Sequence, residues 1–216
     1  MLTRFDRISA VITAVLAVAL WIAGLAIGHA GASPIPHHAT DAQLLHWLRG
    51  NKTPVILGAW LFTTGCLMFV WFAGILRARL AAAEGETHIY STLAFGGAVA
   101  AATFGLGANA DIGAAINASS ISPATEGMFH HIGDLLFLGA ELWLIVMMAG
   151  VAVVASRTAV LPRWWAAFSV LLAVVLWIGP IGWAAVIFGT PIWLLGTAWL
   201  INRPARRRTS TVPVTA

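Results

Sequence analysis

The sequence has few charged residues, and this excludes an ordinary soluble globular domain. Only 9% of its 216 residues are Asp, Glu, Lys or Arg, whereas 60% are hydrophobic. Soluble domains usually carry about 25% charged residues. A chain with so little charge cannot cover a compact fold with groups that water solvates. Its outer surface is therefore expected to face lipid.

Cysteine and lysine are almost absent, and each absence excludes a class of site. Cys66 is the only cysteine, so the chain can form no internal disulfide. Lys52 is the only lysine and lies outside the long apolar runs, which excludes a retinal-type pigment. The Gly-x-Ser-x-Gly nucleophile elbow and the His-Glu-x-x-His zinc motif are also missing from the sequence.

Six apolar runs make up most of the chain. A membrane-spanning helix needs about 20 apolar residues, so we predict an all-α, polytopic membrane bundle of about six transmembrane helices. The first run is too long for the core of a signal peptide, which has about 7 to 15 residues. The predicted spans cover residues 8–28, 55–76, 89–110, 128–155, 164–178 and 183–201. They form a single domain over residues 1–203, which a basic tail follows at 204–216.

The basic residues predict the orientation of these spans. Cytoplasmic connections of membrane proteins carry an excess of Lys and Arg. With both termini in the cytoplasm, only Arg49 and Lys52 are outside, whereas the cytoplasmic set is Arg4, Arg7, Arg77, Arg79, Arg157, Arg163, Arg203, Arg206, Arg207 and Arg208. The net charge of +4 is thus explained by the basic residues of the cytoplasmic connections. Because the basic residues form no face with interleaved aromatics, we expect no nucleic-acid partner. Arginine and alanine usage suggests a bacterial protein of the cytoplasmic membrane.

Three shorter patterns add detail to this bundle. Thr40 and Gln43 have capping-box spacing, which predicts a helix over 41–49 on the outer membrane surface. Gly97, Ala101 and Gly105 form a small-residue face on the third span, where helices approach closely, either within the chain or between copies of it. Pro191 has no N–H to donate to the carbonyl of Ile187, so we predict a kink in the last span.

The fourth span and the residues before it carry a stripe of ionisable side chains. Ser122 and Pro123 predict the helix start. At 100° per residue, four side chains lie within an arc of about 80°: Glu126, His130, Asp134 and Glu141. With 1.5 Å of rise per residue, Glu141 is about 9 Å below the outer surface of the hydrocarbon core. No Lys or Arg lies within a span to pair with it.

These residues predict a polar site that faces outward. We assign Glu141, Asp134, His130, Asp111 and Asn109 to a proton or ligand site, since a carboxyl in hydrocarbon is costly and usually functional. The alternative is a structural role for Glu141, in which its carboxyl forms a hydrogen bond with Thr63, Thr64 or Asn109. A divalent metal is a second use of this region, with His130, His131, Asp134 and Glu126 as ligands. The remaining outer histidines, His29, His37, His38 and His46, need no function in a solvated connection.

Three functional hypotheses remain open on these residues. The first is a small transporter, linked to protons or binding a ligand, with Glu141 as the protonatable group. The second is a membrane enzyme that uses a metal bound by the same residues. The third is a non-catalytic assembly subunit that contacts its partner, or another copy of itself, through the face of Gly97, Ala101 and Gly105.

The last third of the chain resembles a family of small bacterial membrane proteins grouped as a domain of unknown function. The resemblance lies in Leu161–Trp164, in Gly179–Trp183 and in Pro191–Leu194 and covers about 55 residues. These motifs are common at membrane interfaces. It implies a six-span fold in the cell membrane. It carries no activity and no site residues to this chain.

Overall fold

The computed structural model describes residues 3–30 and 39–203, and all regular elements in these ranges are helices. This confirms the all-α class for the described residues. The elements are α1 (Arg4–Leu25), η1 (Ala26–Ala30), α2 (Asp41–Gly50), α3 (Lys52–Glu84), α4 (Ile89–Gly107), α5 (Asp111–Ile116), α6 (Pro123–Arg157), α7 (Arg163–Leu176), α8 (Gly179–Ala184), η2 (Ala185–Gly189) and α9 (Thr190–Asn202), of which η1 and η2 are π-helices. The tail 204–216, His37 and His38 lie outside the described residues.

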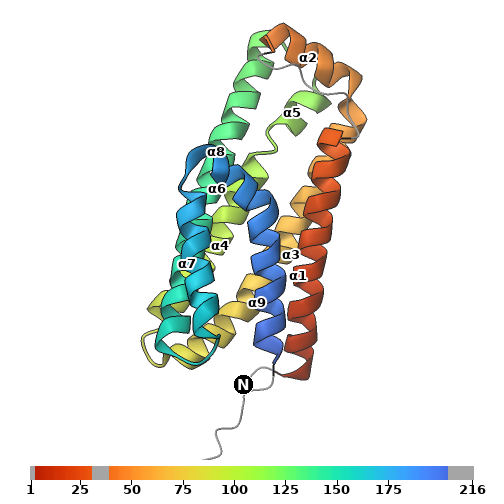
Figure 1. The fold of residues 1–216 in the computed structure, drawn as a ribbon. Helices are drawn as coiled ribbons and strands as arrows, with labels where there is room; N and C mark the ends of the chain where they lie inside the picture. The colour runs from red at the N-terminus through yellow and green to blue at the C-terminus, as the bar shows by residue number, and fades with distance from the viewer. Residues whose placement is uncertain (1–2, 31–38, 204–216) are drawn as a thin grey trace, which may run out of the picture.

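Five helical segments are long and apolar enough to cross a membrane, as a multi-pass protein requires: Arg4–Gly28, Lys52–Glu84, Ile89–Ile116, Pro123–Arg157 and Ile181–Asn202. The helix α7 is also apolar but has only 14 residues. The long helices run side by side, with α1 against α3 and α9, and α6 against α4 and α7 (Figure 1).

The two ends of the bundle differ in structure. The end that holds α2 and α5 lies opposite the N-terminus, and we call it the distal end (Figure 1). Here the predicted capping box is confirmed, because Thr40 Oγ1 accepts from the Gln43 amide and Gln43 Oε1 accepts from the Thr40 amide. Ser122 likewise caps α6, with Pro123 in its first turn. Both caps satisfy amide groups that a helix start leaves without partners.

Glycine lets α4 and α6 approach at backbone distance. A Cβ atom on Gly97 would lie 2.7 Å from the Met147 amide nitrogen, and one on Gly150 would lie 2.8 Å from the Tyr90 carbonyl oxygen. Gly105 faces Phe62 and Cys66 of α3. The small-residue face predicted on the third span is thus occupied by α6 and α3 of the same chain.

Two buried hydrogen bonds join α7 to α9. The Trp165 indole donates to Thr197 Oγ1 over 2.9 Å, and the Trp193 indole donates to Ser169 Oγ over 2.8 Å. Ser169, Thr197 and Trp193 are completely buried. Each indole thereby gains a partner that apolar surroundings otherwise lack, so α7 and α9 are held in one register.

The chain reverses between α7 and α9 just before residues 179–182, the connection left between the last two predicted spans. The segment from Gly179 to Gly182 is helical and begins α8, so the reversal is at Trp177 and Ile178. Proline fits the first turn of a helix, which explains why this segment continues as a helix. The π-helix η2 follows, and its last bond runs from the Thr190 amide to the Ala185 carbonyl. The irregular turn therefore lies directly before Pro191.

We expect Gly97→Ala to lower the stability of the fold, because its new methyl group must displace the α6 backbone. Overpacking of this kind costs about 1–3 kcal/mol. Gly96→Ala is the matched control, since a Cβ atom there has nothing within 4 Å. SDS titration of the purified protein, followed by circular dichroism, measures both variants. Equal transition midpoints for the two would contradict the close α4–α6 contact.

Candidate functional site

Glu141 is the most unusual side chain among the described residues. It lies on α6 and is only 1% exposed. Neither Oε1 nor Oε2 has a hydrogen-bond partner in the described part of the chain. The structural alternative, a bond to Thr63, Thr64 or Asn109, is therefore not found. Thr64 Oγ1 instead donates to the carbonyl of Trp60, one turn earlier in its own helix.

The carboxyl group of Glu141 faces the break between α7 and α8. A Cβ atom on Gly182 would lie 3.3 Å from Glu141 Oε2 and 2.7 Å from the carbonyl oxygen of Leu176. Leu176 is the last residue of α7. In a continuous helix its carbonyl would accept from residue 180, which is a proline and has no N–H. Two oxygen acceptors thus lie next to the same glycine.

The other members of the predicted stripe are not in one environment. Glu126 is 3% exposed, His130 is half-buried and Asp134 is exposed. The cause lies in the elements that cover α6. The helix α2 packs on its first turns, where Asp41 contacts the position of Gly127, and Gly182 of α8 lies beside the carboxyl of Glu141. Asp134 lies between these two contacts in the sequence of α6, so the stripe is interrupted.

The structure also separates the predicted metal ligands. Among residues 3–30 and 39–203, no group of three or more His, Cys, Asp or Glu side chains is placed to hold a metal ion. His130 and His131 have ring centroids 6.1 Å apart, but His131 is exposed whereas Glu126 is buried. Adjacent helical residues point in directions about 100° apart, which explains why the two histidines do not converge.

Asn109 and Asp111 belong to the part of the chain that connects α4 to α6 at the distal end. Asn109 is half-buried in the turn that follows α4, and its Nδ2 atom is buried without a hydrogen-bond partner in the described chain. Asp111 begins α5, and its side chain is outside the described set, as is that of His29. His46 is exposed on α2. None of these positions is shown to meet Glu141.

Two basic residues have a structural role that sequence reasoning missed. Arg49 Nε donates to the carbonyl of Ala118 over 2.7 Å, and Lys52 Nζ donates to the carbonyl of Ile116 over 3.2 Å. Both carbonyls lie at or just after the end of α5, where helix carbonyls lack internal partners. The sequence indicates only the side of the membrane for these residues, because their partners are more than 60 positions away.

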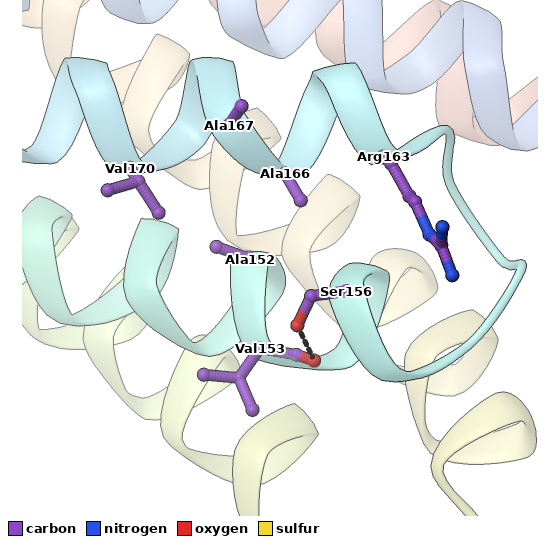
Figure 2. A pocket seen from close by; sticks show the side chains of 7 residues that line it. All are labelled: Ala152, Val153, Ser156, Arg163, Ala166, Ala167 and Val170. Atoms are coloured by element: carbon purple, nitrogen blue, oxygen red, sulfur yellow. Dashed lines mark hydrogen bonds between the residues drawn. The ribbon is translucent and has the colours of Figure 1, made fainter.

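Two surface cavities lie away from the predicted site. The larger, about 550 Å³, is lined by residues of α6 and α7 near the loop that joins the two helices (Figure 2). Its walls are mostly small and apolar, and the Ser156 hydroxyl donates back to the carbonyl of Val153. The second, about 380 Å³, is lined by Asp6, Trp71, Gly74, Ile75 and Ala78. Neither contains a residue of the predicted site.

Comparisons with protein-family models, curated proteins and solved structures found no match to this chain. The resemblance of its last third to small bacterial membrane proteins stays an expectation. Any functional argument therefore depends on the geometry around Glu141.

We expect Glu141→Met to stabilise the folded protein at high pH, where the carboxyl has lost its proton and has no hydrogen bond to donate. A buried polar group without a hydrogen bond costs about 1–3 kcal/mol, and methionine fills a similar volume without that cost. Leu144→Met, one turn away and also buried, is the control, and should change stability by less than about 1.5 kcal/mol. Unfolding midpoints in SDS measure the difference. A clear loss of stability in Glu141→Met at high pH would show that the ionised carboxyl has a partner.

Proposed function

We propose that this chain is a multi-pass protein of the cell membrane that transports a small solute in a proton-linked process. Glu141 is the group that binds and releases the proton. The observation that carries this proposal is a carboxyl that is 1% exposed and has no hydrogen-bond partner among the described residues. Ionisable residues within membrane spans are costly and usually mark ion or substrate paths.

The physical chemistry of this burial favours a coupled process. A neutral carboxyl tolerates apolar surroundings far better than a carboxylate does. Glu141 therefore changes its charge only when water or a cation reaches it, and this requires a movement of the covering elements. Proton exchange at this position is then linked to conformation, as alternating access requires.

The proposed topology has six spans with both termini in the cytoplasm. Toward the N-terminal end, helix segments contain Arg4, Arg7, Arg77, Arg79, Arg157 and Arg163, and Arg203 directly follows α9, whereas Arg49 and Lys52 are at the distal end. This split supports a cytoplasmic N-terminal end. We include α7 as the short span, because Trp164 and Trp177 flank it as interfacial anchors do.

The two other functions suggested by the sequence gain no specific support. The predicted metal ligands are separated in the described structure, and the small-residue face of α4 is covered by the chain itself. A metal-dependent enzyme and an assembly subunit therefore remain alternatives without an observation that favours them.

The topology predicts which loops react with a membrane-impermeant maleimide in intact cells. We expect Ser120→Cys, exposed at the distal end, to be labelled, and Glu86→Cys, exposed in the α3–α4 connection, to be labelled only after lysis. The native Cys66 is buried and supplies a low background. The reverse labelling pattern would show that the topology is inverted. Labelling of both cysteine variants in intact cells would contradict the proposed topology.

Proton movement in proteoliposomes tests the role of Glu141. With an imposed pH gradient and a potassium–valinomycin potential, an internal pH dye should report a flux that Glu141→Gln reduces at least about tenfold, since glutamine cannot bind and release the proton at this position. Glu86→Gln, exposed outside the bundle, is the control. Equal rates in the parent and Glu141→Gln, or no flux from either, would contradict the proposal.

A further inference from the structure

At the break between α7 and α8, a main-chain acceptor and the carboxyl of Glu141 lie beside the same residue, Gly182. The α7 helix ends at Leu176, and α8 begins at Gly179. The last carbonyls of a helix have no internal partner and carry the negative end of the helix dipole, equivalent to about half an elementary charge. At Leu176 the usual partner is removed by sequence as well, because residue 180 is proline.

Gly182 is what allows the two groups to lie close together. Its backbone passes so near to both that an added Cβ atom would be 2.7 Å from the Leu176 oxygen and 3.3 Å from Glu141 Oε2. Any side chain at this position would therefore have to displace α8 from α6 or from the end of α7. A glycine is the only residue that leaves this contact intact.

The electrostatics of this position disfavour a carboxylate. A negative oxygen next to a helix C-terminus is repelled by it. No cation compensates from the covering elements, since Arg163, at the opposite end of α7, is the only ionisable residue in α7, α8 and η2. On α6 itself the nearest ionisable groups are Asp134, exposed two turns away, and His130, one turn further. A neutral carboxyl, in contrast, has an O–H to donate.

We propose that Glu141 and the main-chain carbonyl of Leu176 form a proton-binding site, in which the protonated carboxyl donates to that carbonyl and Gly182 keeps the two groups in reach. This inference rests on the proposed function and specifies its ion. The site offers three oxygen atoms, two from the carboxyl and one from the carbonyl. Three oxygens fit a proton, whereas a divalent cation such as Ca²⁺ takes about six to eight oxygen ligands.

The site also identifies the segment that responds to the proton. When the proton leaves to water, two acceptor groups face each other with no donor between them. The arrangement is relieved if water enters or if α8 moves away from the end of α7. The π-helix η2 follows α8 directly, and such irregular turns commonly mark functional positions in helices.

Infrared difference spectroscopy tests the site without any transport assay. The full-length protein in lipid nanodiscs should show a protonated-carboxyl C=O stretching band that disappears as the pH is raised and that is missing in Glu141→Gln. Gly182→Ala should move this band to higher frequency, because the donated hydrogen bond is weakened. Gly74→Ala, whose added Cβ has only Phe95 within 4 Å, at 3.9 Å, is the control and should leave the band in place.

A second variant guards against misfolding of Gly182→Ala. Pro180→Ala adds an N–H group that competes for the Leu176 carbonyl, and should shift the same band in the same direction. The inference is overturned if the Glu141 band is unchanged in both variants, or if no band depends on Glu141. It is also overturned if sodium chloride, compared with choline chloride at constant pH, removes the band, since the site would then bind a metal cation.

The outcomes separate this inference from the proposed function. A Glu141 band with the expected shifts, but without proton flux in proteoliposomes, supports the site and contradicts transport. Flux that depends on Glu141, with a band that neither Gly182→Ala nor Pro180→Ala changes, supports transport and contradicts the Leu176 partner.

Discussion

The close contact of α4 with α6 supports the position of Glu141. Gly97 and Gly150 bring the two backbones together, so that α6 is fixed along its length against α4 while α7 packs on another side. In lipid, helices gain little from the hydrophobic effect when they associate, so backbone-to-backbone packing through small residues supplies much of the attraction. This contact therefore fixes α6, the helix that carries the buried Glu141, within the bundle.

Many polar side chains within the bundle have a hydrogen-bond partner close by, whereas both carboxyl oxygens of Glu141 have none among the described residues. Hydroxyl groups donate to the carbonyl four residues earlier, at Thr13, Thr64, Thr103 and Ser169. The indoles of Trp165 and Trp193 find hydroxyl partners across the α7–α9 contact. These bonds satisfy donors that hydrocarbon cannot. A carboxyl whose two oxygens have no partner in the described part of the chain costs stability, and functional sites often carry such a cost.

The distal end and the region of Glu141 are stabilised by different means. At the distal end, Arg49 and Lys52 donate to carbonyls at the end of α5, and α2 covers the start of α6. Near Glu141, α8 approaches through Gly182, directly after the break that separates it from α7. The π-helix η2 follows, and such turns are frequent at functional positions in helices. The movement of α8 that the proposed proton site involves does not require a change in the contacts of Arg49 and Lys52.

The sequence by itself determined the helical class, the apolar segments, the helix starts at Thr40 and Ser122, and the presence of a deeply placed carboxyl at Glu141. These features are local, since they depend on composition, on capping chemistry and on the rise of one helix. Tertiary structure alone decided that Glu126 and Glu141 are covered while Asp134 between them is exposed. It also decided that the small-residue face of α4 packs within the chain. The angles of a helical stripe say which side chains point the same way, but the helices that cover each of them come from distant parts of the chain.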